Sequence, residues 1–389
     1  MENNKILVFF LICNSLLFSQ AFKNPPESSS ALSQSGAFVA QCDDASAINF
    51  NPAGLIQLRD GELIFGFNFP YFKTKYIYSS GEEEKKYKFS VLPYFYFVPE
   101  TKNDEFKFGI GFNTPYGQST EWSQDIVRIW NYQVPYYSSM QTGNLMTAFS
   151  FKLTPELSLG LGLNYYYSKL VFKNLIYIPV PGVETTAKIN VDGSAFGGTI
   201  GILYKNDKWS TGIVYKSGFR IDYKGTSVIF GDDYPSEIKI NFPDRINFGV
   251  ACYPLKNWKI EFDTEYYGFS SIKNVYINPG FIPSYEIPKN WKNIYNFYLG
   301  TEYKKNDNLK LRGGIARLNS PIPDETWEPS LPDSDTLIIS FGTELGIKTG
   351  KIEMTLLTSI PKKIKKEGNY EGIYKSKGFF FTIGYKREI

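Results

Sequence analysis

Apolar and polar residues alternate with period two from Gly61 to the C-terminus, as in β-strands that have two different faces. In residues 157–167, leucines and tyrosines alternate with small or polar residues. In residues 258–265, Trp, Ile and Phe alternate with Lys, Glu and Asp. Strand-favouring residues dominate the chain, and 17% of its residues are aromatic. The pattern therefore predicts an all-β fold with one apolar and one small or polar face.

Apolar and polar residues also alternate along the strands of a soluble β-sandwich. The lengths of the connections between the strands therefore distinguish the two types of fold. Tight connections are expected near 100–105, 154–156, 206–207, 256–257, 306–308 and 349–350. Long connections are expected near 79–86, 114–139, 174–186, 225–236, 276–290, 319–334 and 361–377. Short turns at one rim and long loops at the other are typical of outer-membrane barrels. We predict a transmembrane antiparallel β-barrel of about fourteen strands over residues 61–389, with its polar parity facing the lumen.

The N-terminus has the pattern of a secretory signal peptide. Lys5 precedes an apolar run, and small residues stand at Ser19 and Ala21, so residues 1–21 are predicted to be removed. The run is too short for a comfortable helical span of roughly 20 residues, and Cys13 lacks the small preceding residue of a lipoprotein site. No later stretch suits a spanning helix, so we expect localisation in the outer membrane of a Gram-negative-type bacterium.

Composition excludes several classes of function. The chain has no histidine, which rules out Ser-His and Cys-His catalysis and His-ligated metals. A net charge of +3 is too small to indicate nucleic-acid binding. Cys42 and Cys252 have dissimilar contexts, and Cys252 lies on the apolar, lipid-facing parity, which argues against a disulfide. We expect no catalytic residues, no metal and no cofactor.

Residues 22–60 do not alternate and are rich in small residues. Asp43 or Asp44 is placed to cap a short helix, and Asn51 and Pro52 to begin another. Composition alone leaves two interpretations open, a disordered leader or a segment that folds back into the lumen.

Several motifs follow one another in the order of a known family. Residues 36–55 contain the elements D-D-A-S and N-P-A-G-L, and later motifs lie at 116–122, 241–245, 290–292 with 299–303, 311–314 and 320–333. In these motifs the chain resembles the outer-membrane long-chain fatty acid and toluene transporter family, across nearly the whole mature sequence. The resemblance implies a monomeric barrel of about fourteen strands that takes up hydrophobic compounds passively.

The resemblance also implies roles for named residues. The N-terminal segment would be a hatch that closes the lumen, with its motif at Gly36, Asp43, Asp44, Asn51, Pro52, Ala53, Gly54 and Leu55. A lateral exit would lie at a kink in the third strand, which corresponds to Asn113, Pro115, Tyr116 and Gly117. Pro115 cannot donate a ladder hydrogen bond and Gly117 tolerates unusual backbone angles, which gives a physical cause for a kink. Alternatively, Pro115 merely begins the long outer loop.

The outer loop 114–139 is unusually apolar. Trp122, Ile126, Ile129 and Trp130 are candidates for a first capture site, or else for packing over the barrel mouth. If the cargo is a fatty acid, its carboxylate needs a cation, for which Arg312 has luminal parity. Lys169 is the second candidate, although it lies on the apolar parity.

The function expected from these features is passive uptake of fatty acids or aromatic hydrocarbons from the lipopolysaccharide-containing outer membrane, without catalysis. Three alternatives stay open. They are an outer-membrane enzyme with carboxylate-only chemistry, a general porin, and an adhesin or structural barrel.

Overall fold

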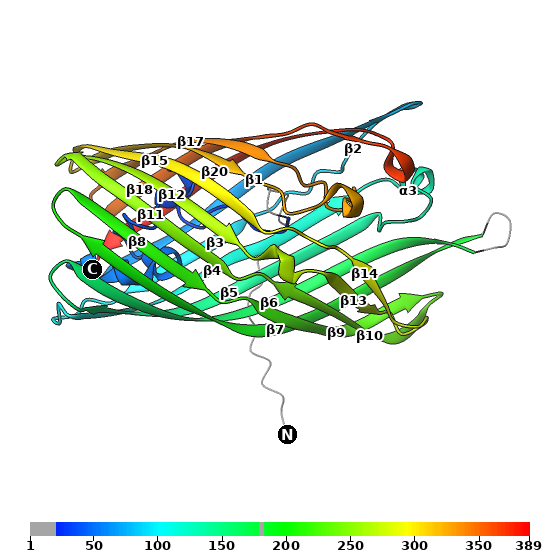
Figure 1. Ribbon diagram of the computed structural model, residues 1–389, viewed down its shortest axis with the longest axis horizontal. Helices are drawn as coiled ribbons and strands as arrows, with labels where there is room; N and C mark the ends of the chain where they lie inside the picture. The colour runs from blue at the N-terminus through cyan, green and yellow to red at the C-terminus, as the bar shows by residue number, and fades with distance from the viewer. Residues whose placement is uncertain (1–20, 179–182) are drawn as a thin grey trace, which may run out of the picture.

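The computed structural model describes residues 21–178 and 183–389, so the predicted signal peptide lies outside the described residues except for Ala21. The described strands form one closed antiparallel sheet (Figure 1). The first and last long strands close it, with Glu62 opposite Glu388 and Ile77 opposite Ile373. Four short strands belong to outer hairpins. The other strands run along the barrel wall, where two pairs of them each form one continuous wall strand; each wall strand is here called a stave. The result is the predicted closed barrel of fourteen staves.

The staves of the first half are β1 (Glu62–Tyr78), β3 (Leu92–Val98), β4 (Phe106–Glu121), β5 (Tyr137–Lys152), β6 (Leu157–Tyr177), β7 (Glu184–Lys205) and β8 (Trp209–Lys216) with β9 (Phe219–Ile229). Those of the second half are β10 (Asp232–Phe242) with β11 (Arg245–Leu255), β12 (Trp258–Tyr267), β15 (Ile294–Asn306), β16 (Leu309–Leu318), β17 (Thr336–Ile347), β18 (Gly350–Pro361) and β20 (Gly372–Glu388). The short strands are β2 (Gly81–Glu84), β13 (Asn274–Asn278), β14 (Tyr285–Pro288) and β19 (Ile364–Lys366).

Short helices occur outside the strands. They are α1 (Ser29–Leu32), α2 (Ala47–Phe50), α3 (Gln124–Ile129), and the 3-10 helices η1 (Pro52–Gln57), η2 (Phe269–Ser271), η3 (Asp324–Thr326) and η4 (Gly368–Tyr370). Among the described residues, the search for a helix long and apolar enough to cross a membrane finds none.

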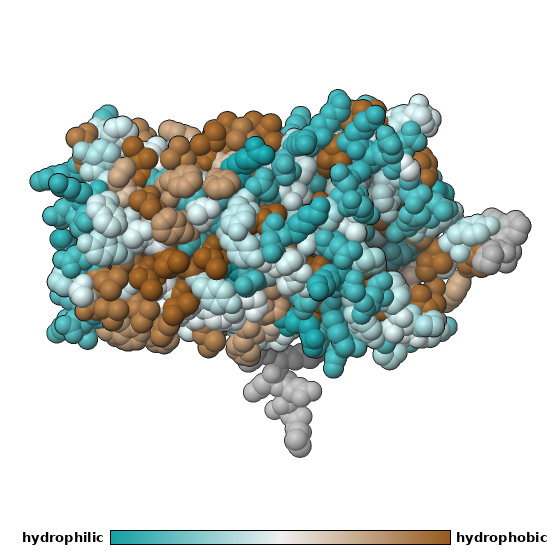
Figure 2. Space-filling view, in the orientation of Figure 1, coloured by the Kyte–Doolittle hydropathy of each residue, from teal (hydrophilic) through white to brown (hydrophobic). Residues whose placement is uncertain are grey.

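The predicted parity of the strands is confirmed. On β20, Phe379 and Phe381 are exposed on the outside, whereas Phe380 and Thr382 are buried inside. Cys252 is exposed and Cys42 is buried, and both thiols are free. Figure 2 shows most hydrophobic side chains as a band over the half of the barrel that carries the short turns. Such a band is what a lipid bilayer requires of a barrel.

The tight connections lie where they were predicted, but four long ones are shorter, including the one predicted at 361–377, which spans 362–371. Strand β4 continues through Pro115, so its loop spans 122–136. The connection predicted at 174–186 is mostly strand, since β6 and β7 have 21 and 22 residues. The loop predicted at 225–236 is a two-residue turn at Phe230 and Gly231, both with positive φ. Strands need only about 9–11 residues to span a bilayer, so these long strands extend beyond it.

Residues 21–60, here called the N-terminal segment, lie within the barrel near the end with the short turns (Figure 1). Asn51 caps η1 by accepting from the Ala53 amide at 3.2 Å, as its sequence predicts. Asp44 caps the turn before α2 through the Ser46 amide at 2.9 Å. The segment is therefore ordered against the wall, which argues against the disordered-leader interpretation.

Carboxylates of β12 hold the segment to the wall. Asp263 accepts from the backbone amides of residues 38 and 39 at 2.9 and 3.0 Å. Glu261 accepts from those of residues 40 and 41 at 2.6 and 2.9 Å. Hydrogen bonds from backbone amides to charged acceptors are stronger than those to neutral acceptors. The four consecutive amides therefore fix this stretch of the segment to one strand.

Candidate functional site

A large cavity lies in the lumen towards the end with the long connections and has a volume of about 870 Å³. Its walls come from the N-terminal segment, β5, β6, β7, β10 and the β13–β14 hairpin. The apolar part of the lining includes Phe22, Met140, Leu170, Phe172, Ala187, Ile189, Ile240, Ile272, Val275, Ile277, Trp291 and Leu331. We call this space the apolar cavity. Its size and lining fit a drug-sized or larger hydrophobic ligand.

A few polar side chains interrupt the apolar lining. Lys289 is the one Lys or Arg among the lining residues that the structure describes, and its Nζ lies 3.1 Å from a carboxylate oxygen of Glu328. Only 12% of the Lys289 side chain is exposed. The sequence did not single out this pair, because it joins two outer connections that are distant in the chain.

Strand β4 departs from regular pairing at the predicted kink. Its register against β5 shifts between Asn113 and Tyr116. Its pairing with β3 covers three residue pairs and ends at Phe112. The burial of β4 changes at the same point, because residues 113–120 are buried on both faces. Pro115 thus lies in a strand at an irregularity and does not begin the loop, and both polar atoms of the Asn113 side chain are buried without a hydrogen bond.

Residues 22–24 of the N-terminal segment add to the edge of β4 that has lost its β3 partner. The Asn24 amide donates to the Pro115 carbonyl at 2.9 Å, and the Gly117 amide donates to the Phe22 carbonyl at 2.8 Å. The Asn24 side chain donates to the Thr114 carbonyl at 2.6 Å. Because Phe22 also lines the apolar cavity, the same three residues border the cavity and pair with the kinked strand.

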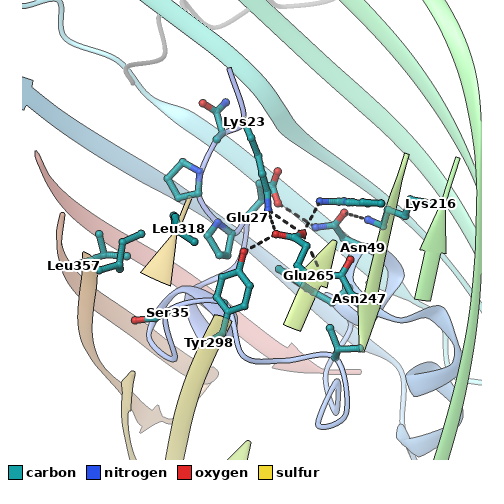
Figure 3. A pocket seen from close by; sticks show the side chains of 18 residues that line it. Lys23, Glu27, Ser35, Asn49, Lys216, Asn247, Glu265, Tyr298, Leu318 and Leu357 are labelled. Carbon is teal, nitrogen blue, oxygen red and sulfur yellow. Dashed lines mark hydrogen bonds and ion pairs between the residues drawn. The ribbon is translucent and has the colours of Figure 1, made fainter. Parts of the chain in front are cut away.

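On the other side of these residues lies a small polar cavity of about 50 Å³ (Figure 3). Glu265 is at its centre and accepts from Lys23 at 3.0 Å and from the Tyr298 hydroxyl at 2.5 Å. Glu27 accepts from the side-chain amide nitrogen of Asn49 at 3.1 Å, and Lys216 donates to the side-chain oxygen of Asn49 at 2.9 Å. Burial lowers the pKa of the Lys23 ammonium, and the charge of Glu265 opposes that shift. Apolar side chains such as Leu318, Ile338 and Leu357 also line this cavity, but its buried charges disfavour a neutral hydrocarbon chain.

The hatch-motif residues are all buried or half-buried within the barrel. Asp43 pairs with Lys259 of the wall, and the Asn51 side chain donates to carbonyls of Val39 and Ile202. The Ala53 carbonyl accepts from Ser150 and Ser158 of the wall at 3.0 and 2.9 Å. The remaining members, Gly36, Asp44, Pro52, Gly54 and Leu55, lie in the same packed stretch. At Gly54 an added Cβ would collide with the Cys42 carbonyl, which explains the need for glycine there.

The candidate carboxylate contacts lie away from the apolar cavity. Arg312 faces the lumen as its parity predicts, but its guanidinium nitrogens bond to Glu302 at 2.7 Å, Glu353 at 2.8 Å and Glu344 at 2.9 Å. Lys169 is exposed on the outer face of β6. Neither residue lines the cavity. Arg312 balances luminal acids, and a role for either residue in binding a fatty acid has no support from this placement.

The apolar outer loop packs over the barrel mouth. Trp122, Ile126 and Trp130 are buried together with Tyr76, Tyr374 and Trp327, whereas Ile129 is 52% exposed. The Trp122 indole donates to the Pro329 carbonyl at 2.9 Å. Three of the four candidate capture residues therefore serve packing in this conformation. First capture at this loop stays a prediction, for which Ile129 offers the exposed surface.

A closed barrel with apolar outer bands, an internal apolar cavity and an ordered luminal segment defines an outer-membrane transport barrel as a class. Residues 14–351 match the family model described as "Outer membrane protein transport protein (OMPP1/FadL/TodX)". The chain belongs to this family, which is made up of transport channels, and its place is the outer membrane.

Similar proteins agree with that assignment. The chain is 23% identical to the long-chain fatty acid transport protein of Escherichia coli K12, over 89% of each chain. It is 24% identical to that of Salmonella typhi, over 73% of each. A crystal structure of a Pseudomonas aeruginosa FadL homologue superimposes with a TM-score of 0.84 at 17% identity, covering 95% of this chain and 99% of that one. The crystal structure of the P. putida toluene transporter TodX superimposes with a TM-score of 0.73 at 17% identity, covering 92% of this chain and 97% of that one. At these identities the solved structures show the shared fold.

Proposed function

We propose that this protein is a passive channel, and not an enzyme, that carries hydrophobic compounds across the outer membrane. Its cargo would be long-chain fatty acids or aromatic hydrocarbons, as the names of its relatives suggest. The observation that carries the proposal is the apolar cavity of about 870 Å³, to whose lining Phe22 of the N-terminal segment contributes. Transfer of an acyl chain from water into such a cavity is favourable by about 0.8 kcal/mol per buried methylene group.

The proposed route has a hatch and a lateral exit. The N-terminal segment would act as the hatch, because four of its amides bond to Glu261 and Asp263 of the wall. The kink at Asn113, Pro115, Tyr116 and Gly117 would form the exit, because β4 lacks its β3 partner there and residues 22–24 take that place. Withdrawal of residues 22–24 would free the edge of β4 and, in the same movement, open the apolar cavity towards the kink. Cargo would then leave sideways into the bilayer.

Lys289 is our proposed contact for the carboxylate of a fatty acid, in place of Lys169 and Arg312. Its ammonium group lines the cavity at the side of the outer connections. Its Nζ lies 3.1 Å from a carboxylate oxygen of Glu328, which neutralises its charge. A cargo carboxylate would have to compete with Glu328, whereas a hydrocarbon would leave the pair intact.

The cavity is tested by filling it. Ala187 is 1% exposed and lines the cavity, so A187W should place an indole in the space where cargo binds. We expect loss of saturable binding of a fluorescent fatty acid and of toluene, with an unchanged mobility shift of the unheated barrel on a gel. F196W, on the exposed outer face of the same strand, is the matched control. Equal binding by A187W and wild type would refute the cavity as the binding site.

A further inference from the structure

The outer faces of β1 and β20 change from aromatic to basic at the same height. Phe69 lies opposite Phe381, and Tyr71 lies opposite Phe379. The next outward pairs are Lys73 opposite Lys377, and Lys75 opposite Lys375. On β1 the residues that alternate with these lysines, Phe72 and Thr74, are buried inside. Four lysines therefore directly follow the lipid-facing aromatic rows on two neighbouring strands.

This change occurs at the outer edge of the apolar band. On both strands the lysines lie towards the end with the long connections, which faces outward in barrels of this kind. On β1 the outward apolar run from Leu63 to Tyr71 covers nine residues, close to the 9–11 that a spanning strand needs. The lysines thus stand where acyl chains end and the headgroups of the outer leaflet begin.

The charges of this cluster are only partly compensated. Lys73 and Lys75 pair with Glu84 and Glu82 of β2 at 3.1 and 2.7 Å. Among the residues that the structure describes, no ion pair is found for the exposed Lys375 and Lys377. Strand β19 extends the positive surface, because its Lys365 lies opposite Ile373, two residues from Lys375. Like charges placed directly opposite each other destabilise a sheet, so an anion bound here would offset an existing repulsion.

We propose that Lys73, Lys75, Lys375 and Lys377, here called the lysine cluster, bind the phosphate groups of a phosphorylated glycolipid of the outer leaflet. The ligand is lipopolysaccharide in chemical terms, with acyl chains attached to a phosphorylated saccharide. Its acyl chains would lie along Tyr71 and Phe379 and their neighbours, and its phosphates would accept hydrogen bonds from the ammonium groups. Lysine is a compact point charge and binds phosphate from several directions. The site is separate from the cargo cavity and does not depend on the transport proposal.

The test is native mass spectrometry of the full mature chain in neutral detergent, titrated with bisphosphorylated lipid A. K375Q/K377Q removes the two lysines for which no ion pair is found among the described residues. Basic residues near an anionic membrane surface each contribute appreciably, so we expect apparent affinity to fall by about tenfold or more. K375R/K377R keeps the charge and should bind as wild type does. K208Q/K256Q removes two exposed lysines from the turns at the opposite rim and should change nothing.

Further comparisons separate the lipid from other anions. Lipid A without phosphates should bind wild type as weakly as lipid A binds K375Q/K377Q, and inorganic phosphate should compete poorly because it lacks acyl chains. The mobility of the unheated barrel on a gel reports that each variant is folded, and K365Q provides a second variant with the same expected direction. Unchanged lipid A binding by K375Q/K377Q would overturn the proposal. So would full competition by inorganic phosphate, which would indicate a site for soluble anions.

Discussion

At the scale of single residues, the Lys289–Glu328 pair decides how the cavity treats a charged cargo. We predict that K289M lowers the affinity for a long-chain fatty acid by about tenfold, because a hydrogen bond between charged groups contributes roughly 1.5–3 kcal/mol. E328Q should raise that affinity, since it frees the ammonium group. Toluene binding should be the same in both variants.

Displacement of a fluorescent fatty acid by each ligand measures these affinities. If K289M weakened toluene and fatty acid binding equally, Lys289 would be a structural residue of the cavity wall and not a carboxylate contact.

The sequence predicted on which face of a strand a side chain lies better than it predicted which residues that side chain contacts. Alternation correctly placed Arg312 in the lumen, because the two faces of a strand follow from parity alone. Its partners, Glu302, Glu344 and Glu353, lie on three other strands, and their meeting depends on inter-strand register. A single sequence does not contain that register. For the same reason Lys289 was missed, since its importance comes from the loops that fold over it.

At the scale of elements, the irregularity of β4 is the proposed exit. P115V/G117V replaces both residues with strand formers and should allow β4 to pair more regularly with β3. We predict that the initial rate of fatty acid uptake falls on the order of fivefold or more. A regular β4 would form backbone hydrogen bonds with β3 and so leave no opening in the barrel wall. Barrel assembly should be unaffected.

The control is P235V, which changes an exposed proline of β10 that lies in register with Thr226 of β9 and away from β4. Uptake by cells that express each variant, with gel mobility as the folding check, measures the effect. Normal uptake by P115V/G117V would remove β4 from the route.

Strand content was readable from the sequence, whereas some strand ends were not. The connection at Phe230 and Gly231 was interpreted as a long loop, because a phenylalanine with φ of +57° gives no recognisable turn signal. Likewise, Pro115 resembles the start of a loop in the sequence. It is accommodated in the strand because the β4 edge that lacks its donor faces the N-terminal segment instead of β3.

At the scale of the whole molecule, the barrel encloses two kinds of luminal space on either side of residues 22–27. The apolar cavity opens towards the long connections, and the charged cavity around Glu265 lies beyond Lys23. The family assignment and the closed barrel follow from features that the sequence displays along its entire length. The division of the lumen does not, because it arises where the N-terminal segment meets several strands at once.

The most direct test of the transport proposal compares the intact protein with a variant lacking residues 22–55, both purified and placed in liposomes. We predict that the intact protein binds a labelled long-chain fatty acid saturably, transfers it across the bilayer and conducts few ions. The variant should lose saturable binding, because Phe22 forms part of the cavity wall, and should conduct ions through its open lumen. Absence of binding of both fatty acid and toluene, together with large ion conductance in the intact protein, would contradict the account and identify a porin.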